Sequence, residues 1–344
     1  MKSVQLVGQF GEENLQVTSE RVPFRDGVVE DESLLASEVE IKISSASLNY
    51  RDLLMIRGQY NKRQPLPFVP CSDGAGEVLA VGSQVTRFEV GDLVCPTFVS
   101  DFVEGLPNDD AIARSRGGPL PGMLRERAYF AERDLVKIPV HLSAREASTL
   151  PCAALTAWTA LVEEAQIRAG QTVLVLGSGG VSLFALQIAK MHGCRVIATT
   201  STKEKATRLE ALGADVVLNY KNDERWGTTC KKQYSGADVV VEVGGAGTLQ
   251  QSLAAVKTGG HVSLIGVLAG AASSINLLPV LMRHVRVQGA FVGSRSSFER
   301  MCRAFSMHEL HPILDEVFSL PDVKRAFSRL AAAEHFGKIT LNLD

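Results

Sequence analysis

The chain has 344 residues, of which 45% are hydrophobic and 22% are charged, a composition typical of a globular protein. Its length exceeds what one hydrophobic core usually supports, so we expect two domains. The formal net charge of −2 excludes a global electrostatic attraction to nucleic acid or to an anionic membrane surface.

The first residues and the cysteines indicate a compartment. The start, MKSVQLVGQFGEENLQV, lacks the apolar core of a signal peptide. The most apolar long segment, 259–282, contains His261, Asn276 and Pro279, and this is unlike a membrane span. The six cysteines are dispersed and form no CxxC pair. We therefore predict a cytoplasmic protein with reduced thiols that binds neither membrane nor nucleic acid.

Residues 1 to about 140 contain short β-like runs, such as EVEIKISSASL and DLVCPTFV, separated by Gly and Pro. Such runs are typical of an antiparallel barrel or sandwich. Within this part, the run SLNYRDLLMIRG carries the polar cluster 49–52 between apolar residues. Asp52 is expected to bond nearby backbone and fix the turn. The Gly- and Pro-rich segment 100–122 predicts a long loop.

Strand-like and helix-like runs alternate from about 150 to 292. TVLVLG predicts a strand buried on both faces, and VSLFALQIAKMHG has helical spacing and ends in a glycine. RVIATT and STKEKATRLEALG repeat the pattern, with Ser201 or Thr202 as the expected N-cap. DVVLNY, DVVVEVG, TLQQSLAAVKTGG and HVSLIGV continue it. This alternation predicts an α/β domain with a parallel, doubly wound sheet.

A glycine-rich turn connects the first strand of this domain to its helix. Gly177 allows the tight turn, and Gly179 lets backbone N–H groups approach a pyrophosphate at the helix N-terminus. Ser182 stands where a third glycine is usual, and its small side chain suits close helix–strand packing. The pattern predicts a dinucleotide site. Its expected members are Gly177, Ser178, Gly179, Gly180 and Val181.

The end of the second strand predicts which dinucleotide binds. An NAD site usually has Asp or Glu there to bind the ribose hydroxyls. Here hydroxyl side chains, among them Thr200 and Ser201, precede Lys205 and Arg208. Hydroxyls and cations favour a 2′-phosphate, so we predict NADP(H). Such a charged run is also common on a solvated helix face, and Glu204 follows one position later than the usual NAD acid.

From about residue 295 the regular alternation of strand-like and helix-like runs ends. The run HFGKITLNL predicts a final strand. The whole order, with LPCAALTAWTAL before GSGGVSLFALQIAK and GADVVLNY and VEVGG after it, resembles the medium-chain dehydrogenase/reductase superfamily. The segment NYRDLLMIRGQY is similar to its zinc-free quinone oxidoreductase and enoyl reductase branch. The resemblance implies a GroES-like β-rich barrel domain, 1–150 completed by 296–344, and a Rossmann domain, 151–295, with a cleft where they meet.

The resemblance also implies roles for single residues. Thr156 is expected to approach the nicotinamide, and Lys338 is expected near the cofactor at the domain junction. Lys205 and Tyr220 match residues that contact the adenosine phosphate. The backbone is expected to line the cofactor at Gly244, Val267 and Phe291.

Many members of this superfamily carry a catalytic zinc, and its ligand positions match Asn49, Ser72 and Cys152 here. Zinc needs three protein N, S or carboxylate ligands and an open position, so one cysteine with an amide and a hydroxyl is a poor site. A rescue by Asp73 and Cys71 is conceivable but is disfavoured by ligand number. The loop 100–122 contains no cysteine for a structural zinc. We therefore predict no bound metal.

Without zinc, alkoxide formation from an alcohol lacks its main electrostatic support. Reduction of a conjugated C=C bond or a quinone requires only a hydrogen-bond donor for the developing oxyanion. The predicted function is thus NADPH-dependent reduction of quinones or α,β-unsaturated carbonyl compounds. Tyr60 is the expected donor or acid, Asn49 a polar contact, Tyr50 a second phenol and Arg295 a cation that could reach the cleft.

Two other functions remain open at the level of sequence. One is an alcohol or aldehyde dehydrogenase of the same superfamily, and the other is an NADPH-binding sensor without catalysis. The superfamily commonly pairs the edges of its cofactor-domain sheets. The resemblance therefore implies a homodimer, with LMRHVRVQGAFV, residues 281–292, as the candidate edge.

Overall fold

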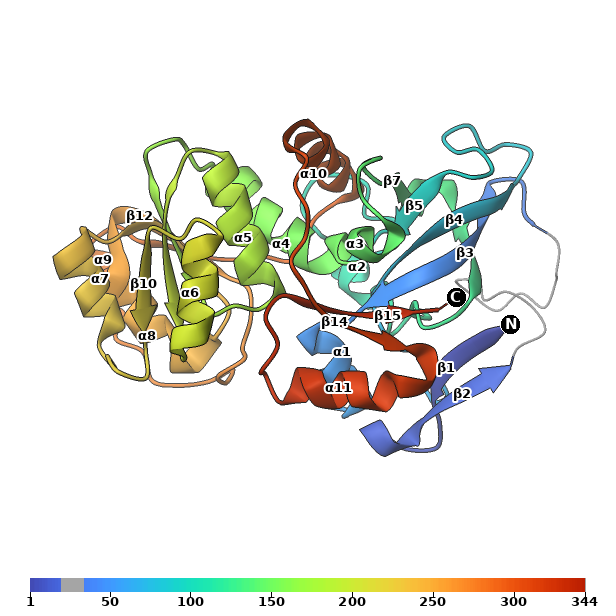
Figure 1. Ribbon diagram of the computed structural model, residues 1–344, viewed down its shortest axis with the longest axis horizontal. Coiled ribbons are helices and arrows are strands. Elements are labelled where there is room, and N and C mark those ends of the chain that lie inside the picture. The colour runs from blue at the N-terminus through green and yellow to red at the C-terminus, as the bar shows by residue number, and fades with distance from the viewer. Residues whose placement is uncertain (20–33, 344) are drawn as a thin grey trace. The chain divides into compact units, whose positions relative to one another are not determined.

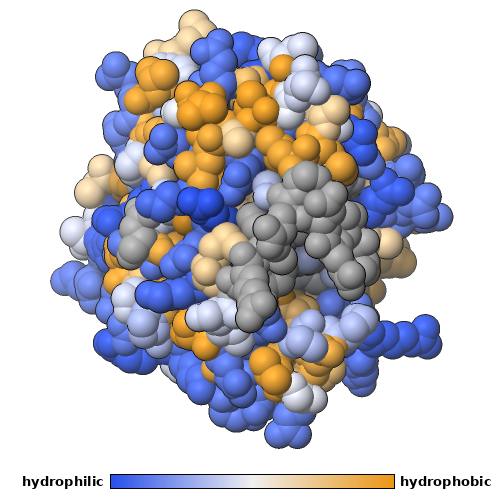
Figure 2. Space-filling model, turned by 90° about the vertical axis from the view of Figure 1, so that its right-hand side faces the viewer, coloured by the Kyte–Doolittle hydropathy of each residue, from blue (hydrophilic) through white to orange (hydrophobic). Residues whose placement is uncertain are grey.

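The computed structural model describes residues 1–19 and 34–343, which divide into two compact units. Unit 1 comprises Met1–Leu155 and Gly293–Asp344, and unit 2 comprises Thr156–Val292. These boundaries lie within five residues of those expected from the sequence. In the described part of the chain, no helix is long and apolar enough to cross a membrane. Hydrophilic and hydrophobic residues are interspersed on the face visible in Figure 2.

Unit 1 is built on a seven-stranded sheet whose labelled strands follow the order β14-β15-β3-β4-β5-β7 (Figure 1). The seventh strand, β6, pairs with β3. The pairs of this sheet are antiparallel except β14 with β15. The final strand predicted from HFGKITLNL is confirmed as β15, which pairs with β3. The bounds are β3 Glu38–Ser47, β4 Asp73–Val81, β5 Leu93–Pro96, β6 Arg127–Ala131, β7 Leu135–Lys137, β14 Leu314–Ser319 and β15 Lys338–Asn342.

A second, two-stranded sheet and short helices complete unit 1. The small sheet pairs β1 with β2 antiparallel. Alternating apolar residues of β3, among them Val39, Ile41 and Ile43, enter a core that also contains Phe327 of α11. The bounds are β1 Lys2–Leu6, β2 Leu15–Ser19, α1 Tyr50–Ile56, α2 Asp109–Ala113, α3 Ala144–Ala147, α10 Arg295–His308 and α11 Val323–Ala331, with single turns η1 Glu12–Asn14, η2 Glu132–Asp134, η3 Leu150–Ala154 and η6 Leu320–Asp322.

The segment 100–122 is mostly irregular backbone, as predicted for a long loop. It contains helix α2, which Asn108 caps by accepting a hydrogen bond from the N–H of Ala111. Arg116 within it is fully buried, and its Nη2 lies 3.1 Å from a carboxylate oxygen of Asp134. The polar composition of the segment does not reveal this ion pair, which lets a guanidinium enter the core.

Unit 2 is a six-stranded sheet in the order β10-β9-β8-β11-β12-β13, and every neighbouring pair is parallel. The connections from β8 run toward β10, and those from β11 run toward β13. Right-handed crossovers in opposite directions place α5 and α6 on one face and α7 and α8 on the other. The predicted doubly wound parallel sheet is therefore confirmed.

Strands β8 to β12 overlap apolar runs identified from the sequence, whereas β13 is polar and exposed, and Val173, Leu174 and Val175 of β8 are fully buried. The bounds are β8 Thr172–Leu176, β9 Arg195–Thr200, β10 Val216–Asn219, β11 Ala237–Glu242, β12 Val256–Leu264 and β13 Arg286–Gly289; the helices are α4 Leu155–Trp158, α5 Gly180–Met191, α6 Lys203–Ala211, α7 Trp226–Tyr234, α8 Leu249–Ala255 and α9 Leu278–Met282, with single turns η4 Thr159–Glu164 and η5 Gly245–Gly247.

Candidate functional site

The polar cluster 49–52 forms the N-terminus of α1. Asn49 is the N-cap residue, and its backbone N–H donates to the Asp52 carboxylate at 2.8 Å. The other oxygen of Asp52 accepts the N–H of Ser72 at 3.1 Å, so Asp52 joins α1 to the segment that leads into β4. Asp52 is fully buried. Its expected structural role is confirmed, since a three-residue spacing places its carboxylate over the free N–H groups of the first turn.

A chain of hydrogen bonds connects Lys338 of β15 with Asp73, the first residue of β4. The ammonium of Lys338 donates to the carbonyl of Leu48 at 2.6 Å and to Oδ1 of Asn49 at 2.5 Å. Nδ2 of Asn49 donates to Oγ of Ser72 at 3.3 Å, and that hydroxyl donates to Asp73 at 2.8 Å.

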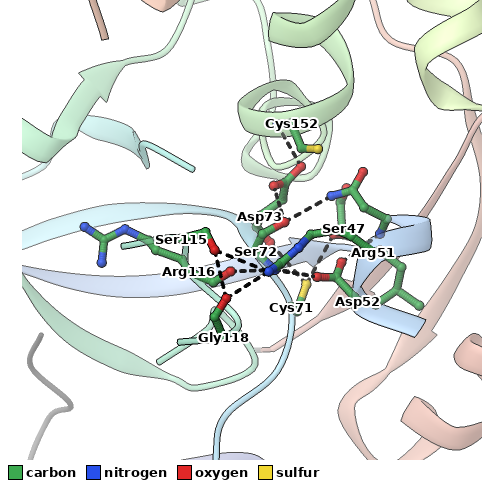
Figure 3. Close-up of polar contacts among 12 residues, drawn as sticks. Ser47, Arg51, Asp52, Cys71, Ser72, Asp73, Ser115, Arg116, Gly118 and Cys152 are labelled. Carbon is green, nitrogen blue, oxygen red and sulfur yellow. Dashed lines mark hydrogen bonds and ion pairs between the residues drawn. The ribbon is translucent and has the colours of Figure 1, made fainter. Parts of the chain in front are cut away.

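The second oxygen of Asp73 accepts the backbone N–H of Cys152 at 3.1 Å (Figure 3). Four segments of unit 1 that are distant in sequence, at residues 48–52, 72–73, 152 and 338, therefore meet at one buried polar group. We call it the Asn49 cluster and define it as Asn49, Arg51, Asp52, Ser72, Asp73, Cys152 and Lys338.

Arg51 fixes the other side of the cluster. Its guanidinium donates to the carbonyl of Arg116 at 2.6 Å and to that of Gly118 at 2.9 Å, and it lies 3.4 Å from the Asp52 carboxylate (Figure 3). The ring of Tyr60 lies over it, with 5.1 Å from the Arg51 Cζ to the ring centroid. Tyr60 is 48% exposed, and its hydroxyl has no hydrogen-bond partner among the described residues. A buried cation thus holds a phenol whose O–H remains available.

Burial dominates the electrostatics of the cluster. It raises the pKa of Asp52 to about 6, against the lowering effect of the Arg51 charge. Burial also raises the pKa of Asp73, while the Lys338 ammonium and hydrogen bonds from Asn49 and Ser72 lower it. The pKa of the Cys152 thiol is raised well above its usual value by burial and by the Asp73 charge. This thiol is neutral at physiological pH and is a poor nucleophile.

The structure brings some of the predicted catalytic residues together and separates others. Asn49 is in the cluster, and Tyr60 contacts it through Arg51. Tyr50 is the first residue of α1 and is 38% exposed. Arg295 begins α10, where it donates to the carbonyl of Arg133 and lies 3.4 Å from Glu299. No contact joins Arg295 to the Asn49 cluster within the described ranges, so its catalytic role stays a prediction.

In unit 2, the glycine-rich turn follows β8 and opens α5. Gly177 has a φ of +75°, a conformation that favours glycine, and a side chain there or at Gly179 would meet no atom within 4 Å. No side chain caps the first N–H groups of α5, a helix of 12 residues. Ser182 donates to the carbonyl of Leu176 at 2.6 Å and ties helix to strand where a third glycine is usual. The turn, with Ser178, Gly180 and Val181, leaves space for an anion at this helix end.

The predicted adenosine-side residues lie at the carboxyl ends of β9 and β10. Asn219 pairs with Thr200, and the N–H of Tyr220 donates to the carbonyl of Thr200 at 3.0 Å. Thr202 caps α6 and accepts the backbone N–H of Lys205 at 3.2 Å, which confirms one of the two expected N-caps. Ser201 lies between strand and cap. The sheet therefore gathers Thr200, Ser201, Lys205 and Tyr220 at one edge.

The remaining cofactor residues of unit 2 follow the next strands. Gly244 follows β11, and its carbonyl accepts the N–H of Ala269 at 2.7 Å, which brings the loop around Val267 beside it. The N–H of Ala290 donates to Leu264 at 3.0 Å and places Phe291 just after β13. Thr156 is buried in α4. The structure gives Lys338 partners within unit 1, and its cofactor contact stays a prediction.

Glu242, at the end of β11, is a residue that the sequence analysis did not identify. Its carboxylate is fully buried and accepts the N–H groups of Gly244 at 2.7 Å and Gly245 at 3.0 Å. It also accepts the hydroxyls of Thr248 and Ser252. One carboxylate thus fixes the turn after β11. Its only signal in the sequence was an acidic residue that ends an otherwise apolar strand.

Comparisons with known proteins agree with this architecture. Residues 36–140 match the family model of the alcohol dehydrogenase GroES-like domain, and residues 180–307 match that of zinc-binding dehydrogenases. A zinc-type alcohol dehydrogenase-like protein of Schizosaccharomyces pombe is 40% identical over 91% of this chain and 93% of its own length. An acryloyl-coenzyme A reductase of Metallosphaera sedula is 30% identical over 91% and 94%.

A solved NAD-dependent alcohol dehydrogenase has 29% sequence identity and a TM-score of 0.89, with 100% of both chains covered. The chain belongs to the medium-chain dehydrogenase/reductase superfamily. Its GroES-like domain lies in unit 1, and its Rossmann-type sheet forms unit 2. It is accordingly a nicotinamide-dependent oxidoreductase of this superfamily.

A nicotinamide dinucleotide fits the residues of unit 2. The open space at Gly177 and Gly179 and the uncapped N-terminus of α5 suit a pyrophosphate. The hydroxyls and the basic residues after β9 would hold the adenosine side. The turn held by Glu242 would lie beside the remainder of the cofactor.

Zinc, which the superfamily's family model implies, does not fit the Asn49 cluster. Oδ1 of Asn49 already accepts a bond from an ammonium, and its Nδ2 is a donor. The Ser72 hydroxyl donates to Asp73, and Cys152 is the remaining candidate ligand. In the ranges 1–19 and 34–343, no group of three or more His, Cys, Asp or Glu could hold a metal ion. The donors are neutral or already engaged, whereas zinc needs anionic or imidazole ligands.

Proposed function

We propose that this protein is an NADPH-dependent reductase that acts without zinc. It transfers hydride to the conjugated C=C bond of an α,β-unsaturated carbonyl compound or to a quinone. The observation that carries the proposal is the bond from Lys338 to Asn49, because it places an ammonium among the residues that match the superfamily's zinc ligands. The 30% identical acryloyl-coenzyme A reductase, named for a conjugated substrate, supports the same reaction class.

The chemistry follows from the charge that each reaction develops. Alcohol oxidation passes through an alkoxide, which a bound metal ordinarily stabilises as a Lewis acid. Reduction of a conjugated carbonyl compound develops an enolate oxygen, and a single hydrogen-bond donor lowers that barrier by about 3 kcal/mol. A site whose residues offer hydrogen-bond donors but no complete set of zinc ligands therefore favours the second reaction.

Tyr60 is the donor that we propose for the enolate or quinone oxygen. Its ring is held over Arg51, while its half-exposed hydroxyl has no partner in the described part of the chain. A phenol O–H can donate a hydrogen bond to such an oxygen. Asn49 has a different task, since both ends of its amide are engaged by Lys338 and Ser72. In our proposal, the Asn49 side chain is held by these two hydrogen bonds and positions α1 and Tyr60.

The nicotinamide supplies the hydride when the cofactor is bound. Unit 2 contributes the helix N-terminus for the pyrophosphate and, in our proposal, Lys205 with Thr200, Ser201 and Tyr220 for a 2′-phosphate. An exposed charge pair with a phosphate is worth about 1 kcal/mol, or several-fold in affinity. Replacing Lys205 by Ala should therefore raise the KM for NADPH several-fold and leave that for NADH nearly unchanged. An equal effect on both cofactors would contradict the assignment.

The test of the reaction is a panel of substrates followed by NADPH absorbance. It contains a benzoquinone, a naphthoquinone, an alkenal, an enoyl-coenzyme A thioester and, with NADP⁺, several primary and secondary alcohols. We expect turnover of one of the conjugated classes by protein that contains no stoichiometric zinc. Alcohol oxidation that depends on bound zinc would establish the alcohol dehydrogenase alternative. Tight NADPH binding without any turnover would favour a sensor.

The Tyr60→Phe variant tests the donor. Loss of the hydroxyl should lower kcat by about a hundredfold, as for removal of one oxyanion donor, while NADPH affinity stays nearly unchanged. Tyr50→Phe is the matched control, because Tyr50 is also an exposed tyrosine and lies at the start of α1, ten residues before Tyr60. An unchanged rate in Tyr60→Phe, or equal losses in both variants, would remove Tyr60 from the mechanism.

We also propose that the protein forms a homodimer through β13. This strand ends the sheet order, so no strand of the described residues pairs with its outer backbone groups. Leu278, Leu281 and Met282 of α9 nearby are 60%, 71% and 73% exposed, and such apolar groups commonly mark an interface. Sedimentation equilibrium should give a dimer that Met282→Glu dissociates. A wild-type monomer at assay concentration would contradict the proposal.

A further inference from the structure

The Lys338 ammonium is buried in the Asn49 cluster, where it hydrogen-bonds neutral oxygens and acts through its charge on two carboxylates. Lys338 is 3% exposed, and both hydrogen bonds of its ammonium go to oxygens beside α1. Buried lysines are rare unless they are paired, because transfer of an ammonium from water is costly. The Asn49 cluster contains two fully buried carboxylates, Asp52 and Asp73. The second cation, Arg51, contacts Asp52 but makes no contact with Asp73.

The orientation of Asn49 depends on this ammonium. An ammonium has only donors, so the amide must turn its oxygen toward Lys338 and its NH₂ group toward Ser72. The Ser72 hydroxyl accepts that bond and donates to Asp73. Every hydrogen bond in the chain from Lys338 to Asp73 is therefore donated in the same direction, toward Asp73. A neutral side chain at position 338 would no longer fix the orientation of the Asn49 amide or the direction of these hydrogen bonds.

We propose that the Lys338 ammonium is a built-in cation that takes the place of a metal ion in this cluster and positions the amide of Asn49. The ammonium contacts one of the three residues that match metal-ligand positions, and Asn49 links it to a second, Ser72. The third, Cys152, is joined to the same chain through Asp73. A divalent ion there would be a third cation beside Lys338 and Arg51. The inference goes beyond the proposed activity, because it holds for any substrate.

The first experiment restores metal ligands and asks whether Lys338 opposes the metal. Asn49→Cys and Ser72→His are combined, so that Cys152 completes a Cys, His, Cys set of the kind that zinc prefers. This double variant is prepared with Lys338 retained and with Lys338→Met. Zinc affinity is measured by competition with a chromophoric chelator, and circular dichroism confirms that both proteins are folded.

We expect zinc to bind about a hundredfold more tightly in the Lys338→Met background, because that background lacks a competing like charge. The matched control is Lys324→Met, which removes an ammonium that donates to the carbonyl of Glu13 on the exposed surface. It should leave the zinc affinity unchanged. Equal zinc binding with and without Lys338, whether tight or undetectable, would overturn the proposal.

A second experiment uses the natural ligand positions and does not depend on a designed metal site. Lys338→Ala leaves a cavity lined by the carbonyl of Leu48 and Oδ1 of Asn49. Ethylammonium should raise the melting temperature of this variant saturably and restore part of its reductase activity. Ethanol and sodium chloride at the same concentrations should do neither. Equal rescue by ethanol would show that Lys338 fills space rather than supplies charge, and would overturn the inference.

Discussion

Two sites among the described residues contain carboxylates that are completely buried, and the two sites stabilise them in different ways. In unit 1, Asp52 and Asp73 share a cluster with the cations Arg51 and Lys338. In unit 2, Glu242 accepts two backbone N–H groups and two hydroxyls, and no ion pair to it occurs among the described residues. The first site is balanced by charge and the second by neutral donors.

The two sites differ because one contains a single carboxylate and the other contains two. Glu242 is a single charge next to a turn, and four convergent donors can replace its water shell. Two carboxylates in one cluster also repel each other, and neutral donors do not remove that repulsion. A cation does, and it couples β15 to α1 across the chain. We therefore expect the two sites to respond differently when one partner is removed.

The largest effect is expected from Lys338→Met. Removal of one partner of a buried charged group typically costs about 3–5 kcal/mol of unfolding free energy. Urea unfolding of the variant measures this loss. The exposed Lys324→Met should change the free energy by less than about 0.5 kcal/mol. The further substitution Asp73→Asn should recover about 1–3 kcal/mol, since it removes a charge that Lys338 compensated. A lack of recovery would show that packing, and not charge, dominates the Lys338 effect.

Glu242→Ala should cost about 3 kcal/mol, because it leaves several buried donors without an acceptor. Glu242→Gln should cost only about 1 kcal/mol, since an amide oxygen still accepts from the N–H groups and both hydroxyls can rotate. Calorimetry of both variants measures the difference between their losses of unfolding free energy. If Gln costs as much as Ala, the negative charge itself is essential at this site, and the distinction between the two sites fails.

The pH dependence of stability should differ through Asp52. The folded pKa of about 6 exceeds the ordinary value of 3.8, so the folded state holds the Asp52 proton more tightly. This contribution to stability is complete below the unfolded value and is lost as the pH rises through about 6. The stability advantage of the wild type over Asp52→Asn should therefore shrink by about 1–3 kcal/mol between about pH 4 and pH 7. Parallel stability curves would refute the assignment.

The smallest expected effect is that of Ser252→Ala, which removes one of four donors to Glu242. Its cost should be about 1 kcal/mol, the usual value of one hydrogen bond. Thermal unfolding measures it, with Ser328→Ala as a control, because that hydroxyl bonds a carbonyl of its own helix on the surface. A loss above about 3 kcal/mol would mean that the donors around Glu242 act as one network.

Most of unit 2 could be predicted because its signals are local. The apolar run 172–176, the turn at Gly177 and the helical spacing after it each lie within a few residues. The cap formed by Asn49 and Asp52 is local as well. The loop predicted at 100–122 is largely confirmed, but the burial of Arg116 could not be predicted, because the composition of the segment does not show that Asp134 is its partner.

The sequence by itself determined the order of strands and helices, the dinucleotide turn and the absence of the usual zinc ligands at positions 49 and 72. These features depend on side-chain periodicity and on residue type, which can be read from residues close together in the sequence. Only the tertiary structure decided that Lys338 donates to Asn49, 289 residues away, and that Asp73 is reached through Ser72. The physical reason is that a buried charge takes its partner from whichever strand the fold places beside it.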